Sequence, residues 1–426
     1  MKQYEEYKDT GNLWLGKIPS HWESKRLSQV SYEHFISNKE IHHQNLLSLS
    51  YGRIIKKDIN TTDGLLPASF DTYQVVEPGN VVLRLTDLQN DQRSLRVGLA
   101  KEEGIVTSAY VCLGVVNKFI DSGYMYYTLH TLDIKKLFYS MGGGLRQNLN
   151  WQGLKKIDIP LPSLAEQEKI VSFLESKTLS IDAYVAERKR ELRLLNELKE
   201  SEIANIITRC LNPDVKMKSY NSLIASAYPE HWELKRNKSF MSLTGYKVGN
   251  NANQYTLLSL TTKGVIVRDI ESGKGKFPKE FDDYQVVKKD ELVFCLFDID
   301  ETPRTIGLVN TEGMITGAYT ALKVNREYAI PEYIYYYYLC VDNIKALKPY
   351  YSGLRKTVRA DKFLQLYMPL PPIDEQCAIV SYIEDKCNKI NSLITELEGE
   401  IEYLKEYKQK LIADCVTGQI NVQSEI

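Results

Sequence analysis

The chain has few of the residues that build metal sites, disulfide frameworks or membrane anchors. Its seven cysteines include no Cys-x-x-Cys pair and its six histidines show no metal-ligand spacing, which predicts reduced thiols and no zinc site. No apolar run reaches the ~18 residues that cross a bilayer, and the opening MKQYEEYKDTGNLWLG lacks the apolar core of a signal peptide. These absences predict a cytoplasmic protein that uses neither a membrane nor a metal.

The chain also lacks an excess of charge of either sign. Its 54 Lys and Arg against 55 Asp and Glu give a net charge of −1, so an acidic partner must be met by local basic patches rather than by the overall field. In contrast, 43% of its 426 residues are hydrophobic and 29 are tyrosines. That composition is typical of a folded protein with two or three domains.

One internal repeat fills the chain. IPSHWESKRL at 18–27 returns as YPEHWELKRN at 228–237, and later segments recur with offsets of 209 to 211 residues. Two homologous halves, produced by a duplication, are therefore predicted. The further pairs are LLSLS (46–50) with LLSLT (257–261), FDTYQVVEPGNVVLRLTDLQ (70–89) with FDDYQVVKKDELVFCLFDID (281–300), VGLAKEEGIVTSAY (97–110) with IGLVNTEGMITGAY (306–319), and PLPSLAEQEKIV (160–171) with PLPPIDEQCAIV (369–380).

Each half begins with short strands and ends with a long helix. Alternating stretches such as YQVVEPGNVVLRL (73–85), punctuated by Gly, Pro and Asn, predict strands and turns. Tyrosine-rich stretches at 122–138 and 331–348 predict a helix packed on the sheet in each half. Their tyrosines are interpreted as core residues, with a base-stacking platform as the alternative. Trp22 and Trp232 are likewise predicted to anchor the first strand of each half.

The long helix is predicted to follow the PLP motif of each half. Ser163 and Glu166 form an S-x-x-E capping box, and Pro372 occupies the first turn at the equivalent place. Apolar residues then recur near heptad spacing, so each helix must bury one seam against a partner, and the other copy is the obvious candidate. The seam residues are Leu174, Ile181, Val185, Leu192 and Leu195 in the first helix, and Ile383, Ile390, Leu393, Leu397, Ile401, Leu404 and Leu411 in the second.

The predicted fold class is α+β, with two mixed α/β globular domains separated by an antiparallel two-helix coiled coil. Residues 1–159 and 216–368 form the globular domains, and residues 160–215 and 369–426 form the long helices. Because the second helix must run back along the first, the C-terminus is expected near the first domain. A helix of ~40 residues is about 60 Å long, so the pair would hold the two domains at a fixed separation.

Two similar heads at a fixed separation could bind two sites along a polymer with a regular repeat, and duplex DNA is the natural candidate. Dimeric DNA-binding proteins place their half-sites about 34 Å apart, and here one chain would do the work of a dimer. The two copies diverge in a basic, turn-rich segment, YGRIIKKDINTTDG (51–64) against TTKGVIVRDIESGKGK (261–276). This divergence predicts that the two half-sites differ in sequence.

The whole-chain duplication, the PLP…EQ..IV junction and the FDxYQVV strand motif resemble the specificity subunit of type I restriction–modification systems, from about residue 14 to 420. The resemblance implies that each head is a target recognition domain that reads one part of a split DNA sequence. It implies that the helices set the gap between the parts and dock two copies of a modification subunit. A restriction subunit is a further implied partner, with S-adenosylmethionine and ATP bound by the partner subunits and no cofactor in this chain.

The residues favour a subunit without catalytic chemistry. The sequence has no GxxxxGK[ST] loop, and the glycines of MGGGLR (141–146) lack the Lys-Ser/Thr of a phosphate loop. It also has no Asn-Pro-Pro-aromatic or Asp-Pro-Pro-aromatic tetrapeptide, since LPPI at 370–373 is not one. Two alternatives stay open, a self-contained DNA methyltransferase or nuclease and a non-enzymatic coiled-coil adaptor.

Basic and amide side chains in three groups of loops are the candidate DNA contacts, because such groups bind phosphates and base edges. Solvated hairpins, caps and salt bridges are the alternatives. The EQ pairs, Glu166 with Gln167 and Glu375 with Gln376, are interpreted as helix-start residues, with contact to the modification subunit as their functional alternative. The candidate DNA contacts are Arg53, Lys56, Lys57, Arg93, Arg96, Arg146, Gln147 and Asn148 in the first half, and Lys263, Arg268, Lys274, Lys276, Arg304, Arg355, Lys356 and Arg359 in the second.

Overall fold

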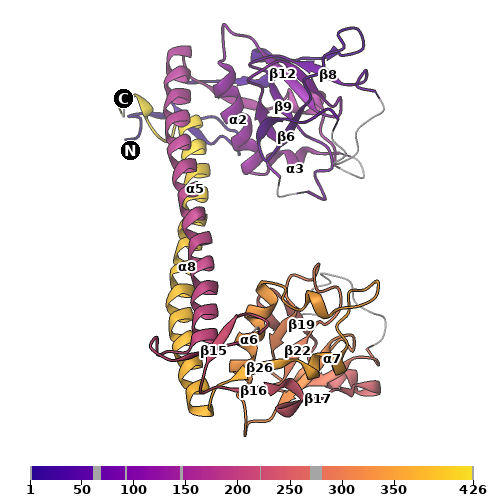
Figure 1. Ribbon diagram of the computed structural model, residues 1–426. Helices are drawn as coiled ribbons and strands as arrows, with labels where there is room; N and C mark the ends of the chain where they lie inside the picture. The colour runs from indigo at the N-terminus through magenta and orange to yellow at the C-terminus, as the bar shows by residue number, and fades with distance from the viewer. Residues whose placement is uncertain are drawn as a thin grey trace. The chain divides into compact units, whose positions relative to one another are not determined.

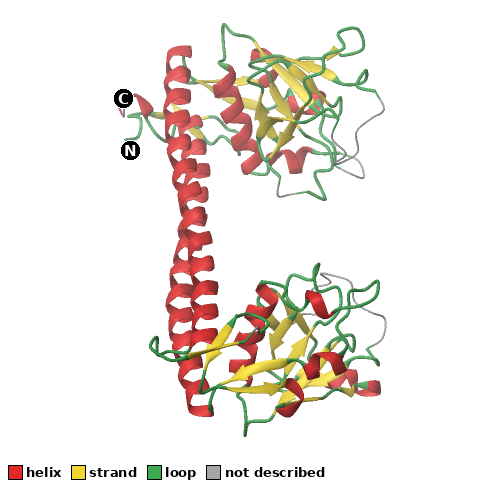
Figure 2. Cartoon of the chain, viewed as in Figure 1, coloured by secondary structure: helices red, strands yellow, loops and turns green. Residues whose placement is uncertain are grey.

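The computed structural model describes residues 2–60, 69–91, 94–143, 147–220, 222–268 and 281–424. The chain divides into two compact units, one of residues 1–189 with 399–426 and the other of residues 190–398. Each unit holds one head of strands and short helices together with a stretch of both long helices (Figures 1 and 2). The predicted fold class, an internally duplicated α+β chain with long helices, is confirmed.

The head of the first unit is built on an antiparallel four-stranded sheet, in the order β10-β9-β12-β4. Val81 and Leu83 of β9 face the main core of this unit, whereas Val82 faces a smaller cluster with Val76 and Cys112, as the two-residue period of a strand requires. The strands are β4 (Ser31–Glu33), β9 (Val81–Leu83), β10 (Val97–Leu99) and β12 (Val111–Val115), with a second sheet of β5 (Ile36–Ser37), β8 (Gln74–Val76) and β11 (Gly104–Val106).

Three two-stranded pairs and three short helices accompany these sheets in the described part of this head. The β3–β13 pair joins the repeated HWE motif to the PLP motif, because Glu23 pairs with Leu161 and Arg26 with Asp158. The elements are β1 (Tyr7–Asp9) with β2 (Lys17–Pro19), β3 (Glu23–Arg26) with β13 (Asp158–Leu161), β6 (Leu47–Ser50) with β7 (Arg53–Lys56), and the helices α1 (Leu27–Val30), α3 (Leu137–Met141) and α4 (Trp151–Leu154).

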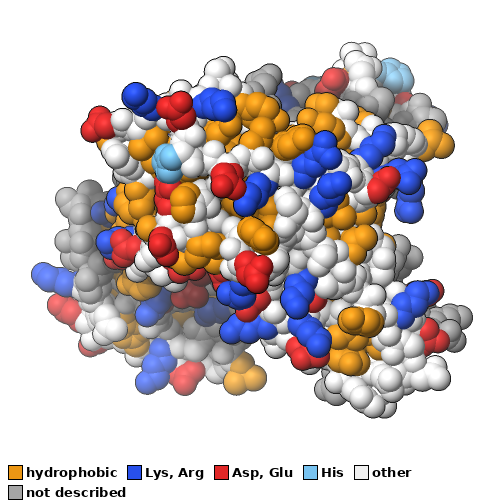
Figure 3. Space-filling view, turned by 60° about the horizontal axis from the view of Figure 1, so that its bottom comes forward, with side chains coloured by type: hydrophobic (Ala, Val, Ile, Leu, Met, Phe, Trp, Pro, Cys, Tyr) orange, Lys and Arg blue, Asp and Glu red, His pale blue; other side chains and the backbone are white. Residues whose placement is uncertain are grey.

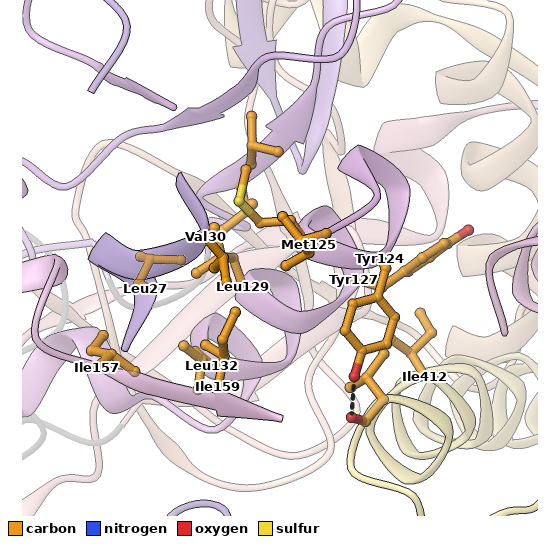
Figure 4. Close-up of a cluster of buried hydrophobic side chains, with 14 of the residues drawn as sticks. Leu27, Val30, Tyr124, Met125, Tyr127, Leu129, Leu132, Ile157, Ile159 and Ile412 are labelled. Carbon is orange, nitrogen blue, oxygen red and sulfur yellow. Dashed lines mark hydrogen bonds between the residues drawn. The ribbon is translucent and has the colours of Figure 1, made fainter. Parts of the chain in front are cut away.

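The tyrosine-rich helix α2 (Ser122–Ile134) packs on the sheet of the first head, as predicted. It begins where the Asp121 carboxylate accepts from the Tyr124 N–H, and it ends before Lys136, whose φ of 59° is left-handed. Tyr124 and Tyr127 are buried with Met125 and Leu129 in the core (Figure 4), so these tyrosines fill the core instead of forming a base-stacking platform.

The head of the second unit repeats this architecture. Its four-stranded sheet has the order β23-β22-β25-β17, which matches β10-β9-β12-β4 element by element, and α6 packs on it as α2 does on the first. The elements are β14 (Met217–Ser219), β15 (Ala227–Pro229), β16 (Glu233–Arg236), β17 (Met241–Leu243), β18 (Tyr246–Lys247), β19 (Leu258–Thr261), β20 (Gly264–Val267), β21 (Gln285–Val287), β22 (Leu292–Phe294), β23 (Ile306–Leu308), β24 (Gly313–Ile315), β25 (Thr320–Val324), α6 (Pro331–Asn343), α7 (Ala360–Gln365) and β26 (Tyr367–Leu370).

The two long helices are α5 (Leu164–Arg209) and α8 (Ile373–Val416). Only one of the two hydrogen bonds of the predicted capping box forms. The Ser163 hydroxyl accepts from the Glu166 N–H at 3.4 Å, whereas the Glu166 carboxylate accepts from the Tyr4 hydroxyl instead of the helix start. Both predicted anchors, Trp22 and Trp232, are buried.

Contacts within each unit show that α5 and α8 run antiparallel. In the first unit Asp182 accepts from Lys408 at 2.7 Å and Arg188 pairs with Glu400, and in the second Lys199 donates to Asn391 at 2.7 Å. The seam prediction was wrong at Leu393, whose side chain is 50% exposed. Heptad spacing alternates three and four residues, so the step from Ile390 to Leu397 passes through position 394 and leaves Leu393 outside the seam.

The C-terminal end of the chain packs on the first head, as expected. The Asn421 N–H donates to the Lys2 carbonyl at 2.8 Å, and the Tyr7 hydroxyl donates to the Gly418 carbonyl at 2.8 Å. Figure 4 shows Tyr124 pointing toward α8, where its hydroxyl donates to the Val416 carbonyl at 3.1 Å. Among the described helices, none combines the length and the apolar character needed to cross a membrane.

Candidate nucleic-acid interface

Two loops of each head meet at one edge of the four-stranded sheet, and together they are called the loop pair. In the first head the loop pair consists of the described residues between β9 and β10, 84–91 and 94–96, with residues 143 and 147–150. Asn148 joins the two loops, because its side-chain oxygen accepts from the Asp87 N–H at 2.9 Å. The Leu149 N–H adds a second link by donating to the Leu85 carbonyl at 2.9 Å.

The loop pair of the second head, residues 295–305 with 352–359, repeats several backbone features of the first, although its first loop is two residues shorter. Asp298 and Lys356 have positive φ values of 47° and 42°, as do Asp87 and Gln147 at 56° and 46°. The Ser352–Thr357 bridge likewise repeats the Gly143–Asn148 bridge of the first head. The described turns of the loop pair are thus repeated with different side chains.

The prediction that Arg96 contacts DNA is wrong, because this side chain is fully buried. Its guanidinium donates to the carbonyls of Arg84 and Thr86 at 3.0 and 2.9 Å, and also to the carbonyl of Asp91. It donates as well to the Tyr139 hydroxyl at 3.0 Å. Arg96 therefore holds the first loop from inside, where DNA cannot reach it.

Arg304 is also drawn inward, against the prediction of a DNA contact. Its guanidinium donates to Asp342 at 3.1 Å and to Asn343 at 2.8 Å, and its side chain is largely buried. Asp342 occupies the position of Asp133 in the first head, which accepts from the Arg96 N–H at 2.6 Å. Burial raises the pKa of Asp133.

The other predicted residues of the second loop pair lie at its surface. Arg355 is exposed, and its guanidinium lies 5.7 Å from the centre of the Phe297 ring. Lys356 pairs with Asp300 and Glu301 at 3.4 and 3.3 Å. Arg359 is exposed and pairs with Asp361 at 3.0 Å. In the first head Gln147 is half-buried and Asn148 is exposed while it links the loops.

The early basic residues lie on or beside the β6–β7 and β19–β20 hairpins, and Gly52, next to Arg53, packs against Leu95 of the first loop pair. Arg53 pairs with Asp182 of α5 at 2.9 Å, and Lys56 pairs with Glu102 at 2.7 Å. Lys57 and Lys263 are exposed and Arg268 is half-buried. Over the face shown in Figure 3, basic and acidic side chains are interspersed rather than gathered by sign. Four further predicted contacts, Arg93, Arg146, Lys274 and Lys276, lie outside the described residues.

The EQ pairs fasten the long helices to the heads. Burial contradicts the alternative of a subunit contact at Glu166, Gln167 and Gln376, and at the half-buried Glu375 that alternative stays a prediction. Gln167 and Gln376 are fully buried, and each has three hydrogen bonds to the backbone of its own head. Glu166 is buried and accepts from the Tyr4 hydroxyl at 2.6 Å. Glu375 is half-buried and accepts from the Trp232 indole N–H at 3.1 Å.

A pocket of about 400 Å³ beside the first loop pair was missed by sequence reasoning. Its walls come from five separate segments, so no local motif could have revealed it. Burial raises the pKa of the Cys112 thiol, which also lines the pocket, to about 12. Among residues whose positions are described, no group of three or more His, Cys, Asp or Glu side chains is arranged to hold a metal ion. The principal lining residues are Glu33, His34, Phe35, Thr86, Tyr110 and Asn148.

Comparisons with known proteins point to one family. Residues 96–193 match the family model described as "Type I restriction modification DNA specificity domain". The chain is 22% identical over 96% of both chains to a putative type I restriction enzyme MjaX specificity subunit of Methanocaldococcus jannaschii. It is 23% identical over 76% of both chains to the MjaVIII specificity subunit of that organism.

A solved structure shares the fold. The likeness has a TM-score of 0.66 at 15% identity and covers 95% of this chain and 99% of the other. That structure comes from work on complex assembly and conformational transition of the type I R-M system. Together the comparisons confirm the resemblance predicted from the duplicated motifs.

Proposed function

We propose that this chain, a DNA sequence-specificity subunit of the type I restriction–modification family, reads its target in two parts with one head on each part. The observation that carries this proposal is the repetition of the loop pair with matching backbone turns and different side chains. Thr86 corresponds to Phe297, and Asn148 corresponds to Thr357. The matching turns would hold the DNA-contacting side chains of the two heads in similar positions. The differences between those side chains would make the two half-sites differ in sequence.

The phosphate contacts are proposed to come from the exposed cations of the loop pairs. Arg355 and Arg359 are the strongest candidates in the second head, because both are exposed at the edge where the two loops meet. Ion pairing of Lys356 with Asp300 and Glu301 reduces the charge that it can offer. Arg146 aligns with Arg355 in the sequence and stays a predicted contact.

The helices are proposed to set the gap between the half-sites and to dock two modification subunits. In the second unit Leu194 and Leu198 of α5 are 53% and 48% exposed, and their i, i+4 spacing places them on one face of the helix. Exposed apolar residues grouped on one helix face are typical of a protein interface. Gln167 and Gln376, which are fully buried, are proposed to have no part in this docking.

Recognition, without chemistry, is the proposed contribution of this chain in the cytoplasm. The modification subunits would bind S-adenosylmethionine and transfer its methyl group to adenine. Restriction subunits would use ATP and cut unmodified DNA. The chain itself would bind no cofactor.

Copurification followed by site selection tests the proposal. The chain, coexpressed with its modification subunit, is expected to select from random duplex DNA a two-part sequence with one gap length. The double variant Leu194→Lys with Leu198→Lys should lose the modification subunit, while the matched change Lys389→Glu on α8 should keep it. Methyl transfer by the purified chain alone would contradict the proposal and favour a self-contained methyltransferase. DNA binding without sequence or gap dependence would favour an adaptor.

A further inference from the structure

The pocket beside the first loop pair has walls that hydrogen bonds hold in place. The buried Gln74 side chain donates to the carbonyls of Thr107 and Tyr110 at 3.1 and 2.7 Å, which fixes the turn that carries Tyr110. Asn148 fixes the backbone that carries Thr86, through its bond to the Asp87 N–H. The pocket is therefore formed before any ligand arrives.

A buried polar group in the pocket lining has no partner. The His34 side chain is 7% exposed, and its Nε2 has no hydrogen-bond partner among the described residues. The backbone of His34 is secured by its N–H, which donates to the Cys112 carbonyl at 2.8 Å. A buried imidazole nitrogen without a hydrogen-bond partner lowers the stability of the fold unless a ligand or a water molecule forms a hydrogen bond with it.

The second head fills the corresponding space with its own side chains. Phe297, which corresponds to Thr86, stacks on Tyr319 with ring centres 6.1 Å apart and planes at 20°. Tyr319 corresponds to the Tyr110 of the pocket, and the Arg355 guanidinium lies 5.7 Å from the centre of the Phe297 ring. An aromatic ring stacked on this tyrosine is thus supplied by the protein in the second head, and none is found among the described residues of the first.

We propose that the pocket of the first head receives a single nucleobase turned out of the DNA duplex, which stacks on Tyr110 as Phe297 stacks on Tyr319. This inference rests on the proposed function in DNA recognition. A concave pocket suits an extruded base, whereas base edges in a groove are read by protruding side chains. Phe35, which is 61% exposed, is the second stacking surface, and the Glu33 carboxylate is an acceptor for an exocyclic amino group.

Abasic substitution on the selected DNA site tests the inference with the complete chain and its modification subunits. Each base of the first half-site and its flanks is removed in turn, and the Kd is measured at one salt concentration. Removing the partner of an extruded base abolishes a base pair that would otherwise have to open. One position is therefore expected where loss of the opposite base tightens binding about tenfold or more.

Two variants connect that position with the pocket. Thr86→Phe copies the second head and is expected to abolish the tightening, while the matched variant Thr86→Val should keep it. Phe35→Ala, at an exposed side chain, is expected to reduce the tightening. It serves as the second test if thermal melting shows that Thr86→Phe does not fold. Sequence-specific binding in which no abasic position tightens the complex would overturn the inference and leave the proposed function standing. Absence of any sequence-specific binding would overturn both.

Discussion

Arg96 and Arg355 lie in the loop pairs of the two heads, but the first is buried and the second is exposed. Arg96 is fully buried and donates to carbonyls of its own loop, whereas Arg355 is exposed over the Phe297 ring. The sequence shows both as arginines in polar loops, and only the fold separates the positioning residue from the candidate phosphate contact. Substitution of Arg96 should therefore lower the stability of the protein, and substitution of Arg355 should weaken DNA binding.

Arg96→Ala is expected to destabilise the protein without changing the salt dependence of DNA binding. The variant leaves the carbonyls of Arg84, Thr86 and Asp91 without their donor, and the free energy of unfolding should fall by about 3 kcal/mol. Arg96→Lys should recover part of this loss. Urea denaturation measures the stability, and unchanged stability with a reduced salt slope would show that Arg96 reaches DNA after all.

Arg355→Ala should leave the stability nearly unchanged and weaken DNA binding evenly across sequences. If Arg355 neutralises one phosphate, the slope of log K against log salt falls by about 0.9. Lys389→Ala on α8 removes the same charge at a distance from the loops and serves as the control. A change of base preference at one position would instead identify Arg355 as a base reader.

Gln167→Ala is expected to loosen the attachment of α5 to the first head. It removes three hydrogen bonds to backbone groups around a buried site, and the free energy of unfolding should fall by about 2 to 3 kcal/mol. Gln376→Ala should do the same in the second head. Copurification with the modification subunit should persist for both, and a selective loss of that subunit without destabilisation would restore the interface alternative.

At the scale of elements, the two tyrosine-rich helices differ in how they respond to acid. His130 of α2 is buried, stacks on Tyr126 and has an Nδ1 without a hydrogen-bond partner among the described residues. Burial, together with the charge of Lys408, lowers the pKa of His130 from 6.5 to about 4. The corresponding residue of α6 is Leu339.

His130→Leu should make the protein less sensitive to acid. Because the folded-state pKa is depressed, the neutral imidazole supports folding fully above pH 6.5, and that support is lost as the pH falls toward 4. The loss of stability between pH 7 and pH 4 should be about 3 kcal/mol smaller in the variant. Denaturation at several pH values checks this, and equal pH profiles for the two proteins would contradict it.

Elements were predicted better from the sequence than were sites. The capping serine, the heptads and the repeated tyrosines act over short distances, so α5, α8, α2 and α6 follow from local pattern. The burial of Arg96 depends on contacts with Tyr139 and several carbonyls, and its counterpart in the second head is Thr305. The pocket needs His34, Thr86 and Asn148 together, and no spacing rule brings these residues to one place.

At the scale of the whole molecule, the duplication accounts for why each unit contains parts of both helices. The end of α8 packs on the first head through Leu411 and Cys415, and the end of α5 packs on the second through Ile203 and Ile207. The return of the chain to its start was predictable because an antiparallel partner was the simplest way to bury each seam. The spacing of the two half-sites is the property that this design is proposed to control.

Shortening both helices by one heptad tests this central claim most directly. In the first unit Asp182 contacts Lys408 and Arg188 contacts Glu400, so residues 185–191 should be deleted together with residues 398–404. Seven residues correspond to about 10 Å of helix, or roughly three base pairs. Binding is measured by gel shift on duplexes whose gap varies one base pair at a time. We expect the sharp optimum of the wild type to move to a shorter gap or binding to be lost; an optimum at the unchanged gap length would contradict the account.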